Sequence, residues 1–258
     1  MPNRLGRPLG AGRDWRRRLL LHHLPLAAAS AVLLVVFMGL PPFTRGGFAL
    51  LDMGAPTPFP TAASYTGGGG HGRTGEAAFT LASGYVATVF LGLTLLVGTA
   101  NLLLHRRNPV STSLARDVGT WAVIASLAHV IVGLKAHGNA GDLFNFVNYF
   151  FFSDGTPRTD SFGLGNWTGL AALVIAVGLL ALSNDRSLRE LKATRWKNLQ
   201  RLNYALFALV ALHAFFYGAL LRMTSPFTVL LIGIVLAVLI GQAVGIGLWR
   251  RSHARTRS

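Results

Sequence analysis

The sequence predicts an all-α membrane protein: six transmembrane helices in a bundle, with both termini in the cytoplasm. Three observations lead to this prediction. Apolar residues make up 52% of the 258 residues and charged residues only 13%, against about 25% charged in soluble domains. The apolar residues are concentrated in six long runs. The basic residues, which outnumber the acidic ones by 24 to 9, lie mostly between alternate runs.

Each apolar run approaches the roughly 20 residues with which an α-helix crosses a bilayer. Helices are expected because backbone groups find no water in the hydrocarbon core. The first run follows a basic segment, as in a signal peptide, but it is long and no small-residue cleavage site precedes Pro41. We therefore expect an uncleaved helix there. The six runs cover residues 19–40, 81–104, 118–134, 165–182, 199–221 and 227–249.

These runs divide the chain into six parts. The middle part is a transmembrane core, and the loop before it is rich in glycine and proline and is expected to be flexible. In order, the parts are a basic cytoplasmic segment 1–18, a first helix 19–40, an outer loop 41–80, the core 81–222, a sixth helix 223–249 and a basic tail 250–258.

Charge predicts the orientation. If six helices cross the membrane, 19 of the 24 basic residues fall on the side of the two termini. Cytoplasmic loops of membrane proteins carry such an excess of Lys and Arg. Both termini are therefore expected inside, and the loops 41–80 and 136–164 outside. The second loop is rich in aromatic residues, which indicates a short interfacial helix or, alternatively, a lid over a buried site.

Several functions are excluded or disfavoured. The chain has no cysteine, which excludes disulfides, thiolate metal sites and iron–sulfur clusters. It is basic, but nucleic-acid binders do not carry apolar runs of this length, so no nucleic-acid partner is expected. No phosphate-binding P-loop sequence is present. The lipid bilayer is the partner that the composition predicts.

Two histidines lie deep within the spans and are the candidate site residues. His129 is about 17 Å along the third helix and His213 about 21 Å along the fifth, at 1.5 Å per residue. Both helices are expected to run in the same direction, so the two residues share a depth in the outer half. Two neutral imidazoles can bind one haem iron from opposite sides. Alternatively, each bonds a carbonyl or hydroxyl group in a packed bundle. A bare metal site is disfavoured because further ligands are missing at this depth.

Two stretches of sequence surround these histidines. One runs from Arg116-Asp-Val-Gly to His129, and the other from Trp196-Lys-Asn-Leu-Gln-Arg-Leu-Asn-Tyr to His213. They resemble the basic R-x-x-G turn with its helical His, and the W-x-x-L-H-R-L-x-Y motif with a second His, of the ferric reductase-like transmembrane domain family. The nearest branch is the haem-binding membrane subunit of the bacterial methionine sulfoxide reductase system. The resemblance implies a b-type haem with His129 and His213 as axial ligands to its iron.

The chain departs from the family at the positions that precede the two histidines by 13 residues. Gln200 stands where the family commonly has His, 13 residues before His213, and Arg116 stands 13 residues before His129. One haem is therefore expected rather than two. Arg116, Gln200 and Arg201 are candidate contacts for haem propionates, a quinone or a flavin, so quinone and FMN are further candidate cofactors. Alternatively, Arg116 is an orientation charge.

The resemblance implies an electron-transfer subunit of a haem-dependent oxidoreductase in the bacterial inner (plasma) membrane. The donor would be a quinol or a flavoprotein, and the acceptor an outer-side redox protein, a ferric chelate or an oxygen species. No catalytic side chain is expected, because the haem carries the redox chemistry. Two alternatives stay open: a cytochrome b subunit of another respiratory complex, and a non-redox membrane protein, such as a transporter or assembly factor, that retains the fold.

Overall fold

The computed structural model describes Arg16 and residues 18–39, 74–104, 110–137, 143–218 and 225–255. These residues form helices and connecting turns, and no strand occurs among them. The elements in chain order are a π-helical turn η1 (Leu19–His23), α2 (Leu24–Gly39), α3 (Thr74–Leu103), α4 (Val110–His137), a 3-10 helix η3 (Leu143–Tyr149), α5 (Ser161–Leu182), α6 (Asp185–Gln200), α7 (Leu202–Phe216) and α8 (Pro226–Arg255).

Six helical segments in the described part of the chain are long and apolar enough to cross a membrane. Their apolar side chains point outward: Val35, Val174 and Ile240 are 71%, 64% and 61% exposed. Lipid tails, unlike water, are a favourable environment for such a surface. The prediction of six transmembrane helices is confirmed, and the chain is a multi-pass membrane protein. The segments are Leu19–Gly39, Ala78–Leu103, Leu114–Lys135, Ser161–Leu182, Thr194–Phe216 and Pro226–Arg251.

Several helix ends differ from the predicted ranges, including α4, which begins at Val110 instead of residue 118, and α5, which begins at Ser161 instead of residue 165. Residues 74–80, assigned to the outer loop, form the first turns of α3, where Glu76 lies beside the positive end of the helix dipole. Helix α7 ends at Phe216 instead of residue 221, because Gly218 adopts a positive φ of 83° and its N–H donates to the carbonyl of Phe215. Helix α8 continues to Arg255, inside the predicted tail. Residues 41–73 of the outer loop lie outside the described residues.

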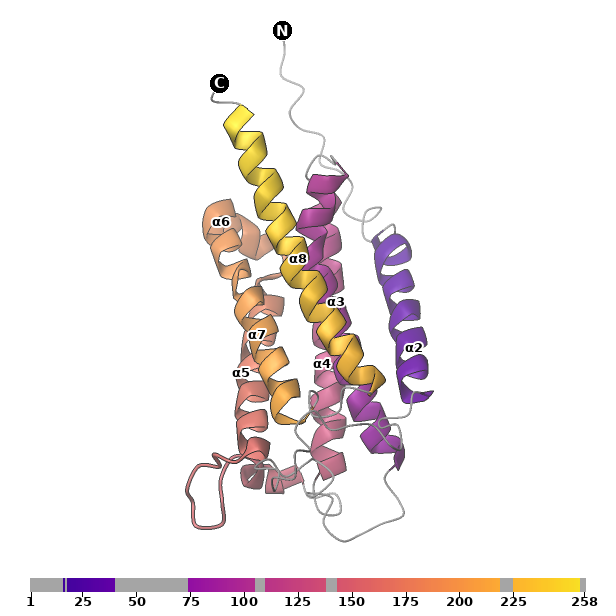
Figure 1. Cartoon of the computed structure of the whole chain (residues 1–258), viewed down its shortest axis with the longest axis vertical. Helices are drawn as coiled ribbons and strands as arrows, with labels where there is room; N and C mark the ends of the chain where they lie inside the picture. The colour runs from indigo at the N-terminus through magenta and orange to yellow at the C-terminus, as the bar shows by residue number, and fades with distance from the viewer. Residues whose placement is uncertain are drawn as a thin grey trace.

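The transmembrane helices are arranged as two pairs with flanking helices. Helix α3 packs mainly against α4, and α5 mainly against α7. Helix α8 packs on α3, and α2 lies on the flank of the bundle opposite α5 and α7 (Figure 1). Phe37, Tyr85 and Phe227 join α2, α3 and α8, with ring centroids 4.8–6.4 Å apart. This arrangement leaves the space between the two helix pairs for the candidate site.

Helix α6 is polar and lies at the end of the bundle at which α8 ends (Figure 1). Asn184 caps its start by accepting the N–H of Ser187 at 2.8 Å. Lys192 has φ 60° and ψ 157°, which divides the helix into two parts at a kink. The indole of Trp196 then donates to the carbonyl of Leu182 at 2.9 Å, which holds the second part against the end of α5. The kink thereby directs the chain back into the bundle at Gln200.

The aromatic segment after α4 folds onto the opposite end of the bundle. The short helix expected there is confirmed as η3. The hydroxyl of Tyr149 donates to the carbonyl of Leu134 at 3.0 Å, and Phe150 and Phe151 pack against Trp167. The segment is thus attached to both α4 and α5. Residues 138–142 lie outside the described residues.

Candidate functional site

A cavity of about 1510 Å³ lies between α3, α4, α5 and α7. It is larger than ordinary small-molecule pockets, which measure about 300–1,000 Å³. Every site residue proposed from the sequence lines it, from one end to the other. Those residues are His129, His213, Arg116, Gln200 and Arg201.

His129 on α4 and His213 on α7 lie side by side in this cavity. Their ring centroids are 5.8 Å apart, and the ring planes are nearly perpendicular at 86°. The prediction that both residues share one depth is confirmed. We call this end of the cavity the histidine level.

Each imidazole bonds the backbone of a neighbouring helix through Nδ1. The partner is the carbonyl of Thr80 on α3 for His129 and the carbonyl of Gly165 on α5 for His213, both at 2.7 Å. A carbonyl can only accept, so each Nδ1 must carry the hydrogen. In the neutral ring the lone pair then lies on Nε2, the nitrogen that would bind a metal. A hydrogen bond of this kind fixes the tautomer and ring orientation of a ligating histidine.

A glycine stands one helical turn after each of these carbonyls. A Cβ atom on Gly84 would lie 2.9 Å from Nδ1 of His129, and one on Gly169 would lie 2.7 Å from Nδ1 of His213. Both distances are shorter than van der Waals contact, so only glycine lets the rings approach the backbone this closely. The two helix pairs therefore hold their histidines by the same arrangement.

The ring separation fits one metal atom held between two imidazoles. Two metal–nitrogen bonds of about 2.0–2.1 Å and two ring radii of about 1.1 Å place the centroids about 6.3 Å apart. The observed 5.8 Å differs by half an ångström. Among the described residues no group of three or more His, Cys, Asp or Glu is arranged to hold a metal ion. The alternative of packed histidines explains the Nδ1 contacts but gives no reason for two imidazoles to meet across a cavity.

Aromatic residues enclose the histidine level. The ring of Tyr217 lies 4.9 Å from that of His213, and its hydroxyl donates to Oδ1 of Asn166 at 2.8 Å. Burial raises the pKa of the Tyr217 hydroxyl, which keeps it a neutral donor. Tyr149 and Phe150, from the segment after α4, also line the cavity. This placement favours the lid hypothesis for part of that segment.

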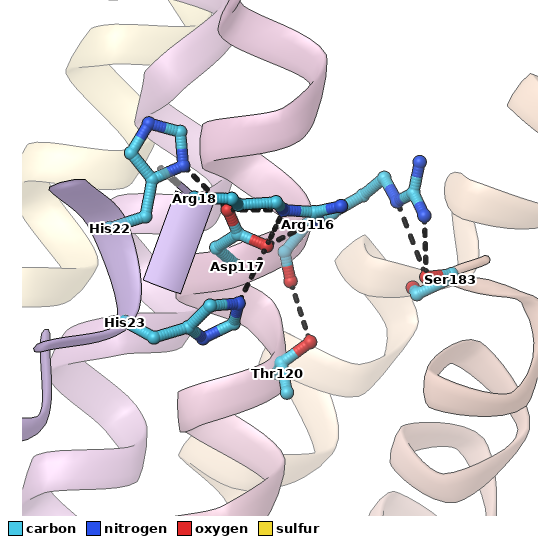
Figure 2. A network of polar contacts seen from close by, with 7 residues as sticks. All are labelled: Arg18, His22, His23, Arg116, Asp117, Thr120 and Ser183. Carbon is cyan, nitrogen blue, oxygen red and sulfur yellow. Dashed lines mark hydrogen bonds and ion pairs between the residues drawn. The ribbon is translucent and has the colours of Figure 1, made fainter. Parts of the chain in front are cut away.

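The other end of the cavity is polar and basic, and we call it the arginine level. Nε and Nη2 of Arg116 donate to the carbonyl of Ser183 at 3.2 and 2.9 Å (Figure 2). The side-chain nitrogen of Gln200 is buried and has no hydrogen-bond partner in the described part of the chain. Lys197 and Arg201 are exposed at the rim. No Asp or Glu lines the cavity among the described residues.

Sequence reasoning missed an ionic cluster centred on Asp117, the neighbour of Arg116. The carboxylate is only 1% exposed. It accepts hydrogen bonds from Nε and Nη2 of Arg18, and from Nδ1 of His22 at 2.6 Å (Figure 2). Nε2 of His23 lies 3.5 Å from the same carboxylate. It therefore connects η1, at the start of the first span, to α4. His22 and His23 were expected to be interfacial residues. The available signal was a carboxylate directly before the third apolar run, inside the span Leu114–Lys135, because such groups need a partner in the membrane.

Four further histidines have side chains that lie outside the described part of the structure. Only the backbone of His137 and of His253 is described. His71 and His105 lie outside the described residues.

Comparisons with models of protein families, with curated proteins and with solved structures gave no match. The resemblance to the ferric reductase-like family accordingly stays a prediction from the sequence motifs. The paired geometry of His129 and His213 is the feature of the site that points to a function.

Proposed function

We propose that the chain is a membrane-embedded b-type cytochrome, and that His129 and His213 would hold its one haem. The supporting observation is the pair of imidazoles at 5.8 Å across a cavity, each with its Nδ1 bonded to a backbone carbonyl. A haem bound there supplies one-electron redox chemistry.

The residues of the chain have three roles in this proposal. The carbonyls of Thr80 and Gly165 orient the rings and raise the basicity of Nε2. Gly84 and Gly169 leave room for that contact. Tyr149 and Phe150 exclude water from the histidine level. Axial ligands, hydrogen bonds to them and burial are the features by which a protein sets a haem potential.

The proposed setting is the bacterial inner membrane with both termini in the cytoplasm, supported by the bias of 19 of 24 basic residues to one side. The arginine level then faces the cytoplasm and the histidine level the outside. Electrons would come from a quinol or a flavoprotein and pass to an outer-side acceptor. The resemblance favours a partner of the methionine sulfoxide reductase type. A cytochrome b subunit of another respiratory complex has the same haem site and differs only in its partners.

A non-redox membrane protein that retains the fold is the second candidate function. Transporters usually place polar groups and broken helices near the bilayer midplane. Here α4 and α7 are continuous through the histidine level. This continuity disfavours transport.

Optical spectra of the purified protein test the proposal. After expression with ample haem, dithionite reduction should give the Soret and α bands of a b-type haem, at one haem per chain. His129→Ala and His213→Ala should each abolish these bands. His137→Ala, eight residues farther along α4, is the matched control and should leave them unchanged. A wild-type protein that folds but shows no haem bands contradicts the proposal.

A further inference from the structure

The arginine level lies farther along the helices from the histidine level than a haem alone extends. Arg116 and Gln200 each precede the histidine of their segment by 13 residues, which is about 20 Å along a helix. The propionate arms of a haem reach roughly half that distance from the iron, from the lengths of the bonds between them. A haem held at the histidines would leave most of the arginine level unfilled, so this level is a separate part of the cavity, and the propionate contacts considered for Arg116 and Gln200 stay a prediction.

The charges at the arginine level favour an anionic ligand. The charged residues among the described lining are all cations: Arg116, Lys197 and Arg201. Gln200 adds a buried amide N–H₂ group that has no partner in the described part of the chain. A buried donor without an acceptor is costly, and an oxygen-bearing ligand would satisfy it. The cluster offers several donors and no competing carboxylate.

A second cavity opens this level toward the bilayer. It measures about 420 Å³ and lies between α3, α7 and α8. Leu95, Gly98, Asn101 and Tyr204 line both cavities, so the two adjoin. Its outer wall includes Ile246 and Trp249, which are more than half exposed on the face of α8. An apolar chain could therefore extend from the arginine level into lipid.

A bridge of side chains borders this opening. The hydroxyl of Tyr204 donates to Oε1 of Gln242 at 2.9 Å, and Nε2 of Gln242 donates to the carbonyl of Leu95 at 2.7 Å. The bridge connects α7 to α8 and α8 to α3. Trp249 lies at the same end, where indole rings commonly mark the depth of lipid head groups.

We propose that the arginine level binds the phosphate head group of an anionic phospholipid, with an acyl chain leaving between α7 and α8. Basic pockets between transmembrane helices on the cytoplasmic side bind anionic head groups. The phosphate oxygens accept from Arg116 and Gln200, and the exposed Lys197 and Arg201 add charge at the rim. The apolar chain fills the second cavity beside Gly98. The site does not depend on a haem at the other end.

Native mass spectrometry of the full chain tests this site. Equal amounts of phosphatidylglycerol and phosphatidylcholine with identical acyl chains are added to the detergent-solubilised protein. The wild type should retain several-fold more phosphatidylglycerol. Arg116→Gln should lower that preference about tenfold, as expected for loss of a charge-assisted contact. Arg186→Gln removes a cation from exposed α6, outside the cavity, and should have no effect.

A second variant tests the passage without changing charge. A Cβ on Gly98 meets no atom within 4 Å, so Gly98→Leu should fill the junction of the two cavities and reduce retention of either lipid. Gly247→Leu on α8 also enters open space but lines neither cavity, and it is the matched control. If Arg116→Gln does not fold, the comparison of Gly98→Leu with Gly247→Leu still tests whether lipid occupies the passage.

Three results would overturn the proposal. The first is equal retention of both lipids by the wild type. The second is the same loss from Arg116→Gln and Arg186→Gln. The third is retention of an added neutral quinone with no preference for phosphatidylglycerol, which would assign the level to a quinone. A protein without haem that still selects phosphatidylglycerol would contradict the proposed function and leave the lipid site standing.

Discussion

The two ends of the cavity use the same helical segments for different purposes. At the histidine level, His129 and His213 bond the backbones of neighbouring helices and meet in the centre. At the arginine level, 13 residues earlier in each segment, Arg116 bonds the end of α5 and Gln200 presents a buried amide nitrogen. The comparison shows that one repeated spacing can carry two chemistries: a pair of neutral imidazoles at one end, and an arginine beside a buried amide at the other.

The largest effect is expected from filling the space beside the imidazoles. In Gly169→Ala or Gly84→Ala, the added methyl group must push the ring away from its carbonyl, because it would lie within 3 Å of Nδ1. The ring then loses its orientation, and we expect haem retention on a size-exclusion column to fall about tenfold or more, a range seen for loss of supporting contacts to ligating histidines.

Gly178→Ala is the control for this prediction. It lies on α5, and a Cβ there meets no atom within 4 Å. Full haem retention by all three variants would show that the close approach of the rings to the backbone is not needed for ligation.

A smaller effect, on stability and not on haem, is expected from Asp117→Asn. The substitution replaces the charged acceptor that Arg18, His22 and His23 share with a single neutral amide oxygen. Breaking a fully buried ion pair costs about 3–5 kcal/mol. Arg18 and His23 are about one-third exposed, so we expect a smaller loss of about 1–3 kcal/mol. Thermal unfolding in detergent measures it, and the haem spectrum of the folded protein should be unchanged.

Glu190→Gln is the matched control for Asp117→Asn, because its carboxylate pairs with Arg186 on the exposed side of α6. Exposed pairs of this spacing contribute about 0.3–0.5 kcal/mol. If both variants unfold at the same temperature as the wild type, the Asp117 cluster does not hold the first helix in place.

The smallest effect is expected from Tyr217→Phe. The variant keeps the ring beside His213 and removes the hydroxyl, and with it the hydrogen bond to Asn166. A neutral hydrogen bond contributes about 0.5–1.5 kcal/mol, so haem affinity measured by titration of the apoprotein should fall less than about tenfold. A complete loss of haem would mean that the Tyr217 hydroxyl has a direct role at the histidine level.

The fold was largely predictable because lipid imposes a simple rule. A backbone without water must form helices of about 20 residues, and the hydropathy of the chain marks them. The errors occurred where that rule does not apply. The end of α7 before Gly218 and the kink of α6 at Lys192 depend on the backbone conformation of single residues. Hydropathy carries no information on that conformation.

The site was predictable in part. Spacing along two helices was enough to place His129 and His213 at one depth, and the structure brings them together. The spacing could not show which carbonyls the two imidazoles bond, because every residue carries a carbonyl. Nor could it pair Asp117 with Arg18, a contact between residues 99 positions apart. Such contacts depend on which helices become neighbours, and that follows from packing.

The backbone contacts of the two imidazoles have an evolutionary consequence. A threonine supplies the acceptor on one side and a glycine supplies it on the other, and either could be replaced without loss of the oxygen itself. The features that natural selection must preserve are then few: two imidazoles and three gaps the size of a methyl group, at Gly84, Gly169 and Gly165, where a Cβ would lie 2.6 Å from the ring of Tyr217. Most other residues around the site are free to drift, so chains that share this arrangement could diverge until little recognisable sequence remains.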